Sequence, residues 1–174
     1  MQSGKQPKTK ILETSVISME ELSMESVDRI NTQTIIYPLP DQELLSKEEQ
    51  AWKVKLPNDY ADFIKKNNGV TPIDNSFTFD NHGYLIERFL CILKEPDKSN
   101  DGMYDIDVIL TLTLTLTLTQ IEDRLTDNED LVGVEILPIA VLFAGDFLCL
   151  DYREDNLNPS VCVWCHEESG ELDL

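Results

Sequence analysis

The sequence has no apolar run that approaches the roughly 18–20 residues needed to cross a bilayer. Lysines occur near its start, but no apolar segment follows them, so they do not form a secretory signal. We therefore expect a cytoplasmic protein with no membrane partner. The four cysteines are then expected to remain thiols in a reducing compartment. They are Cys91, Cys149, Cys162 and Cys165.

The sequence also lacks the motifs of common enzyme classes. It has no G-x-G-x-x-G, no phosphate-binding G-x-x-x-x-G-K-[ST] and no G-x-S-x-G. Only two histidines are present, and no second paired motif accompanies the cysteines to complete a zinc site. Carboxylate pairs such as Asp105 and Asp107 are expected on solvated surfaces. The sequence therefore predicts a protein that is not an enzyme and that uses no cofactor or metal.

One short stretch has a formal match to a cofactor motif. Residues 162–166 read C-x-x-C-H, which is the attachment signature of c-type haem. Haem attachment requires export, and these residues lie in a β-rich run where side chains three positions apart point to opposite faces. We expect instead that Cys162 packs inside the protein and that Cys165 lies near the margin of a sheet.

Basic residues are scarce. The chain has 14 Lys and Arg against 33 Asp and Glu, which gives a formal net charge of −19. The excess is concentrated in residues 97–135 and 146–174, which carry −8 and −7. Such a surface repels nucleic acid, which proteins bind by neutralising phosphates, and it attracts a basic protein. A soluble acidic protein without a basic partner also fits the charge.

The longest apolar run, residues 136–151, is divided by a turn signal at Gly145 and is followed by a shorter run at 161–164. Apolar and β-branched runs bounded by Gly, Asn, Asp and Pro are typical of strands. The pattern predicts a three-stranded antiparallel meander over residues 136–165, at the centre of the core. Two further runs, 76–80 and 84–93, flank an Asx/Gly turn and predict a hairpin.

Two helices are expected before these strands. The first covers residues 41–52, with Asp41 as its N-cap, although Ser46 and Glu49 also fit a capping box. The second begins at Asn58 as its cap and ends at Gly69, which supplies a left-handed stop. Residues 1–36 have weak patterns and are expected to form an arm or to cover the domain of residues 37–174.

Residues 110–119 alternate Leu and Thr, which is a strand-like period. Without residues 111–118, the flanking apolar positions fall on one helical stripe. We infer that a dipeptide tract has expanded inside a helix, where eight added residues turn the downstream face by about 80°. Thr is also a poor helix former. The helix is therefore predicted to be broken or looped here, or the tract to be extended.

Several separated segments resemble one family. Residues 56–69 resemble the L-P-x-D-Y-x-x-F-[LI]-x-x-x-N-G signature of the SUKH superfamily, named partly for a yeast regulator of cell-wall assembly. Residues 137–140, 145–151 and 161–167 resemble its [IL]-P-[IF]-A, G-D-x-[LI]-C-[LF]-D and V-x-[VL]-W-x-H-E patterns, in the same order. The resemblance covers about residues 38–168.

The resemblance implies an α+β fold in which N-terminal helices pack on a curved, mainly antiparallel β-sheet. Family members usually continue into a C-terminal helix at the point where this chain reaches Leu174. Many bacterial members are immunity proteins that bind toxins, often nucleases, whereas eukaryotic members resemble interaction and scaffold modules. Neither group is known for catalysis.

These observations together predict an immunity protein whose acidic surface binds and neutralises a basic toxin, with a nuclease as the favoured class. The alternative is a regulatory scaffold module that binds another protein. Asp146 is expected either to cap the Gly145 turn or to contact the partner. The candidate partner-binding residues are acidic groups of the second half: Asp146, Asp151, Glu154, Asp155, Glu167 and Glu168. The sequence makes no prediction of oligomeric state.

Overall fold

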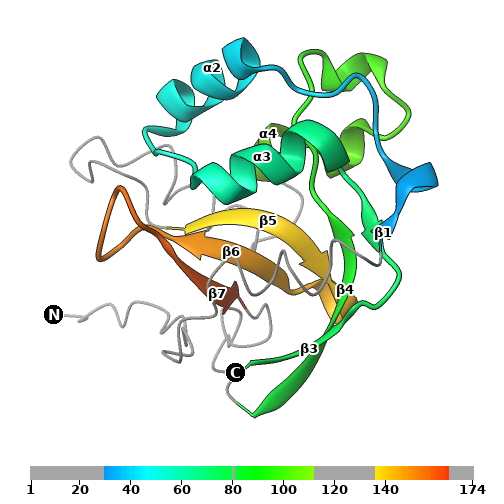
Figure 1. Ribbon diagram of the computed structural model, residues 1–174, viewed down its shortest axis with the longest axis vertical. Helices are drawn as coiled ribbons and strands as arrows, with labels where there is room; N and C mark the ends of the chain where they lie inside the picture. Colours follow the sequence, from blue (N-terminus) through cyan, green and yellow to red (C-terminus); the bar gives the residue numbers. More distant parts are fainter. Residues whose placement is uncertain (1–29, 80, 112–135, 165–174) are drawn as a thin grey trace, which may run out of the picture.

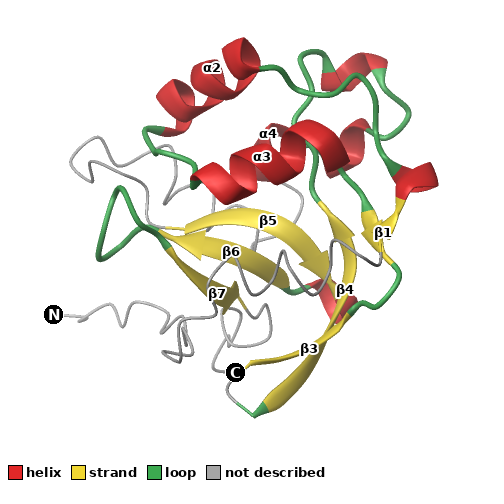
Figure 2. Cartoon of the chain, in the orientation of Figure 1, coloured by secondary structure: helices red, strands yellow, loops and turns green. Residues whose placement is uncertain are grey.

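The computed structural model describes residues 30–79, 81–111 and 136–164 (Figure 1). Within this part of the chain, helices lie above one face of a five-stranded antiparallel sheet, and a separate two-stranded sheet lies at one side (Figures 1 and 2). The predicted α+β fold class is confirmed. The helices are α2 (Gln42–Trp52), α3 (Asn58–Asn67) and α4 (Ile106–Thr111), with 3-10 turns η2 (Thr32–Thr34), η3 (Pro96–Lys98), η4 (Gly102–Tyr104) and η5 (Phe143–Gly145). The strands are β1 (Ile30–Asn31), β2 (Thr71–Pro72), β3 (Ser76–Phe79), β4 (His82–Phe89), β5 (Ile136–Leu142), β6 (Phe147–Asp151) and β7 (Ser160–Trp164).

The predicted meander is confirmed. Strands β5, β6 and β7 pair in sequence order, and each pair is antiparallel. Gly145 has a φ of 85°, so the turn between β5 and β6 uses a left-handed position that glycine adopts readily. The predicted hairpin is also confirmed as β3 and β4. However, β4 ends at Phe89 rather than at residue 93, because the backbone of Ile92 bonds to the side chain of Asn68 instead of to a strand.

The first predicted helix begins as expected. An Asp41 carboxylate oxygen accepts a hydrogen bond of 2.8 Å from the Leu44 amide, and Ser46 lies inside the helix. The predicted cap of α3 was wrong. Asn58 is the first helical residue, and Pro57 occupies the cap position, where its carbonyl accepts from the Ala61 amide at 2.9 Å. Proline is tolerated at this position because the amides at the start of a helix have no intrahelical partner, so its missing N–H costs no hydrogen bond.

Strand register shows which face of the sheet meets the helices. Phe89 pairs with Ala140, which pairs with Leu148, so these residues share one face. The Phe63 ring of α3 lies 5.1 Å from the Phe89 ring, so this face packs against α3. The opposite face is also apolar and includes Phe147 and its neighbour Trp164, with ring centroids 6.0 Å apart. Cys162 is buried, as expected, whereas Cys165 lies outside the described residues.

Residues 30–36, the last part of the predicted arm, pack on the domain. Strand β1 pairs with β2, and the side chain of Ile36 is only 3% exposed. Arg88 fixes the same segment, because it donates to the carbonyls of Thr34 and Gly69, both at 2.7 Å. Residues 1–29 and the Leu/Thr tract from residue 112 lie outside the described residues. No helix in the described ranges is long and apolar enough to cross a membrane.

Candidate functional site

The structure does not gather the predicted acidic residues into one cluster. Asp146 and Asp151 lie at opposite ends of β6, and Asp146 is half-buried after the η5 turn. Glu154 and Asp155 are both exposed and lie together in the loop between β6 and β7. Glu167 and Glu168 lie outside the described residues. The candidate site is therefore the β6–β7 loop, residues 152–159.

Asp151 anchors the start of this loop. It is 8% exposed, and both of its carboxylate oxygens accept hydrogen bonds from the guanidinium of Arg153, at 2.9 and 2.6 Å. The Arg153 amide donates a third bond to the same carboxylate at 3.0 Å. A bidentate ion pair of this kind fixes the relative orientation of the two side chains and also pairs their charges. Asp151 is thus largely neutralised within the molecule and holds the loop in place.

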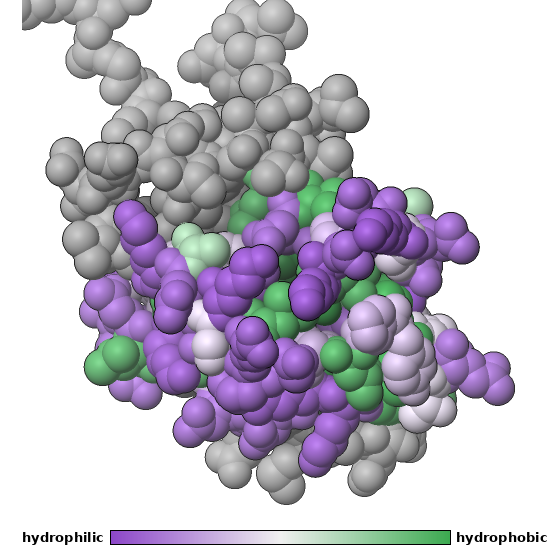
Figure 3. All heavy atoms as spheres, turned by 90° about the horizontal axis from the view of Figure 1, so that it is seen from above, coloured by the Kyte–Doolittle hydropathy of each residue, from purple (hydrophilic) through white to green (hydrophobic). Residues whose placement is uncertain are grey.

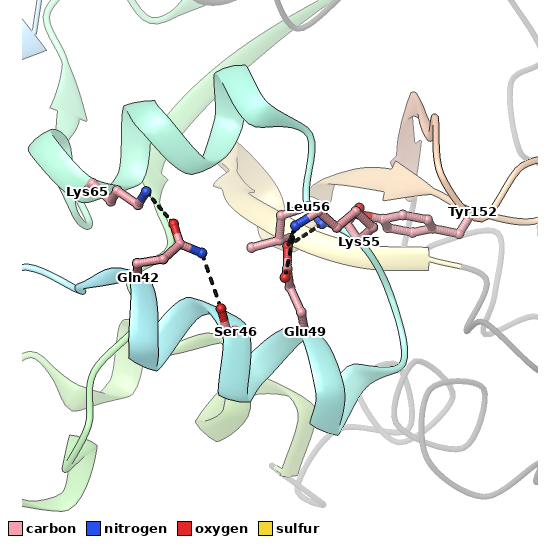
Figure 4. A network of polar contacts seen from close by, with 7 residues as sticks. All are labelled: Gln42, Ser46, Glu49, Lys55, Leu56, Lys65 and Tyr152. Carbon is pink, nitrogen blue, oxygen red and sulfur yellow. Dashed lines mark hydrogen bonds and ion pairs between the residues drawn. The ribbon is translucent and has the colours of Figure 1, made fainter.

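The next residue ties the loop to the helices. The buried Tyr152 hydroxyl donates a hydrogen bond of 2.8 Å to the carbonyl of Lys55, in the connection between α2 and α3 (Figure 4). Burial raises the pKa of Tyr152, so the phenol stays protonated as a donor. Glu49 of α2 steadies the same connection by accepting from the Leu56 amide at 2.9 Å and pairing with the Lys55 ammonium at 3.2 Å.

Asp155 organises the tip of the loop. One of its oxygens accepts from the backbone amides of Leu157 and Asn158, at 2.8 and 3.1 Å. Its other oxygen accepts from the Asn158 side chain at 3.4 Å. These bonds to the charged form, led by that from Leu157, lower the pKa of Asp155. The loop therefore holds an ionised carboxylate in a fixed local turn.

Leu157 is the residue that this turn presents. Its side chain is 69% exposed although the loop around it is held at its base and at its tip. The sequence analysis did not single out Leu157. The pattern that could have indicated it is a single apolar residue between two asparagines, directly after a pair of acidic residues. An apolar side chain bordered by Glu154 and Asp155 suits contact with a protein surface. The arrangement provides binding groups and no reacting pair.

Besides Asp151, the described residues include two more buried carboxyl groups, Glu48 on α2 and Asp105 just before α4. Asp105 is 2% exposed and accepts from the amides of Leu93 and Val108, so its predicted place on a solvated surface was wrong. Burial raises the pKa of Asp105 to about 6. Asp107 accepts from the Trp52 indole at 2.7 Å. Among the described residues, no group of three or more His, Cys, Asp or Glu side chains forms a metal site.

The β6–β7 loop and the sheet below it fall inside one family match. The family model described as SMI1-KNR4 cell-wall, SUKH_6, matches residues 42–173. The chain belongs to this family. Comparison with curated proteins and with solved structures finds no match. SUKH domains generally act as immunity or regulatory modules that bind proteins, and they are generally not enzymes.

The most characteristic residues of the SUKH segments have structural roles in this chain. Asn68 is fully buried, and its side chain amide donates to the carbonyls of Ile36 and Ile92 at 3.2 and 3.1 Å. Gly69 has a φ of 67°, and a Cβ placed there would lie 2.5 Å from the Ile36 side chain. Trp164 is 2% exposed. The family motifs therefore build the scaffold, while the exposed loop residues remain available for a partner.

Proposed function

We propose that this SUKH protein is an immunity protein that binds and neutralises a basic toxin domain, with the β6–β7 loop as its contact surface. The observation that carries the proposal is the exposure of Leu157 on a loop anchored by Tyr152 and Asp155. Loops that are ordered before binding lose less conformational entropy when they bind. An exposed apolar residue on such a loop is suited to be a central contact.

The charge of the protein supports a basic partner. The net charge of −19 accelerates encounter with a cationic surface, and Glu154 and Asp155 place two carboxyl groups beside the apolar contact. A nuclease is the favoured class of toxin, because its substrate groove must attract phosphates and is therefore cationic. Inhibition would follow from occlusion of that groove. The association rate should fall as salt increases.

The test begins with the reading frames that neighbour this gene and uses the basic C-terminal domain of any large toxin-like protein that one of them encodes. The full chain and its variants are co-expressed with that domain, and both cell rescue and affinity at several salt concentrations are measured. We expect L157A to weaken binding by about tenfold or more, as for a central interface residue. We expect E154Q to slow association more than it speeds dissociation.

Matched controls are available at other exposed positions. Met103 of η4 is 61% exposed, so M103A removes a similar apolar side chain outside the loop. Asp62 is an exposed acid of α3, so D62N removes one charge outside the loop. Both controls should bind and rescue as the wild type does. If no basic toxin domain binds even at low salt, the immunity function is wrong and the regulatory scaffold function replaces it.

A further inference from the structure

Among the described residues, the β3–β4 hairpin leaves one edge of the sheet without a partner strand. Strand β3 is the terminal strand in the order β3-β4-β5-β6-β7, and no other strand in the described ranges pairs with its outer edge. The hairpin extends away from α2 and α3, at the bottom of Figure 1. The surface above those helices, seen in Figure 3, is by contrast mostly hydrophilic where it is coloured. An open edge strand is a template for pairing with another chain.

The register identifies which backbone groups are available. The Ile86 amide donates to the Asn75 carbonyl at 2.7 Å, so these two residues form a hydrogen-bonded pair. Bonded and non-bonded pairs alternate along an antiparallel ladder. Ser76, opposite Leu85, and Thr78, opposite Gly83, are therefore the non-bonded positions. Their N–H and C=O groups point outward, away from β4, and their side chains are exposed.

A hollow of about 230 Å³ lies on the same hairpin. Its lining consists of Ser76, Phe77, Thr78, Gly83, Tyr84 and Leu85. A Cβ at Gly83, one of the lining residues, would meet no atom within 4 Å. Leu85 is 43% exposed, and Phe143, 70% exposed, lies in η5, which contacts β4. A side chain from an added strand would thus find an apolar wall beside the outward backbone groups.

The local charge specifies the partner. Residues 73–87 contain three acidic residues and no lysine or arginine. Asp74, at the start of β3, and Glu87, on β4, are both exposed. A second copy of this chain is disfavoured as the occupant, because it would bring a second hairpin with the same three acidic residues against this one. An extended segment with basic residues around apolar ones is complementary to this edge.

We propose that the outer edge of β3 binds an extended basic segment of a protein partner as an added strand, with an apolar side chain in the hollow beside Leu85. Such strand addition gains affinity from backbone hydrogen bonds and specificity from the pockets for alternate side chains. The site is separate from the β6–β7 loop, since β3 and β7 are opposite edges of the sheet. The proposal does not depend on the identity of any toxin.

The test measures binding of a fluorescein-labelled peptide, Lys-Lys-Val-Thr-Val-Thr-Val-Lys-Lys, to the full chain. Hydrogen exchange of the Ser76 and Thr78 amides is followed in parallel. We expect both amides to become protected when the peptide binds. Thr78→Pro removes one outward N–H while keeping the inner ladder, as proline can on an edge strand. It should weaken binding by about tenfold, whereas Thr78→Ala, which keeps the N–H, should bind normally.

Two peptides complete the experiment and keep it decisive if Thr78→Pro does not fold. One carries Glu in place of each Lys, and the other is N-methylated on every Val and Thr amide, so that neither of its edges can donate backbone hydrogen bonds. Both should lose binding, and Leu157→Ala should bind the original peptide normally. No binding of the basic peptide, equal binding of the Glu peptide, or equal binding of the methylated peptide would overturn the proposal. Protection of the Ser76 and Thr78 amides by dimerisation without peptide would overturn it in favour of a second copy.

Discussion

The Tyr152 hydroxyl and the Lys55 carbonyl, 97 positions apart in the chain, are joined by a hydrogen bond of 2.8 Å. This bond fixes the start of the β6–β7 loop against the connection between α2 and α3 (Figure 4). Glu49 holds the same connection from α2 through the Leu56 amide. The position of the exposed Leu157 therefore depends on helices that are distant in the sequence. The hydrogen bond between Tyr152 and Lys55 therefore connects the candidate contact surface to the helical part of the scaffold.

Loss of this bond should destabilise the protein. Tyr152→Phe removes the hydroxyl and leaves the buried ring in place, so the Lys55 carbonyl loses its donor. We expect the free energy of unfolding to fall by about 1 kcal/mol, which is typical of one such hydrogen bond. Urea unfolding followed by tryptophan fluorescence measures the change. The loop amides, including that of Leu157, should also exchange faster with solvent.

Tyr60 provides a control with the opposite expected sign. It is 1% exposed, and its hydroxyl has no hydrogen-bond partner among the described residues. Because a buried hydroxyl without a partner is unfavourable, Tyr60→Phe should leave stability unchanged or raise it by about 1 kcal/mol. Equal losses of stability in Tyr60→Phe and Tyr152→Phe would show that the bond to Lys55 contributes nothing specific.

Glycines 102 and 83 should respond differently to the same substitution. A Cβ at Gly102 would lie 1.9 Å from the backbone oxygen of Pro96, which cannot rotate away as a side chain can. We expect Gly102→Ala to destabilise the protein by about 3 kcal/mol through forced backbone displacement. Gly83→Ala meets open space and should change stability by less than about 0.5 kcal/mol. Thermal unfolding of both variants checks this, and similar melting temperatures would contradict the steric argument.

The elements that sequence patterns predicted well are those specified by local signals. The Asp41 cap, the left-handed Gly69 and the apolar runs of β5, β6 and β7 are each signalled within a few positions of the sequence. The error at Asn58 arose within the same local reasoning, because Pro57 and Asn58 both suit a helix start. Local chemistry thus identified the elements, whereas their ends shifted, by one residue at the cap of α3 and by four at the end of β4.

The features that escaped prediction depend on contacts between distant segments. Asp105 is acidic and lies beside other acids in the sequence, yet it is buried because the amides of Leu93 and Val108 bind it. Arg88 lies in a strand pattern, and only the fold brings it to Thr34 and to the Tyr104 ring, 4.6 Å from its guanidinium carbon. The neutralisation of Asp151 differs, because its partner Arg153 lies only two residues away and was not considered beside the acidic residues. Burial of charge cannot be inferred without the partners that compensate it.

Asn68 illustrates this with a measurable consequence. Its side chain oxygen accepts from the Ile92 amide at 2.8 Å, and its amide nitrogen donates to two carbonyls. Asn68→Ala would leave those buried backbone groups of Ile36 and Ile92 unpaired, so we expect a loss of about 3 kcal/mol in urea unfolding. Asn67→Ala alters the half-buried last residue of α3 and is the matched control, with little expected effect. Equal stability of the two variants would contradict this role for Asn68.

Glu48 should make the stability of the protein depend on pH. Burial, and then a hydrogen bond with Asp107, raise the pKa of Glu48 from 4.5 to about 8. A carboxyl group with a raised pKa keeps its proton in the folded protein after the unfolded chain has lost its own. The free energy of unfolding should therefore decrease as pH rises from about 4.5 to about 8 and become level above that range. Asp105, with a pKa of about 6, adds to the decrease at the acidic end.

The substitution Glu48→Gln isolates this contribution. Glutamine keeps a donor toward Asp107 and has no proton to lose, so the variant should show a flatter dependence between about pH 6 and pH 8. Urea midpoints of the wild type and of Glu48→Gln at several pH values provide the measurement. Asp107 also accepts from the Trp52 indole, so Trp52 fluorescence reports whether the contact between α2 and α4 persists. Parallel curves for the two proteins across this range would show that Glu48 does not carry the raised pKa, because a residue without a titrating proton cannot reproduce its slope.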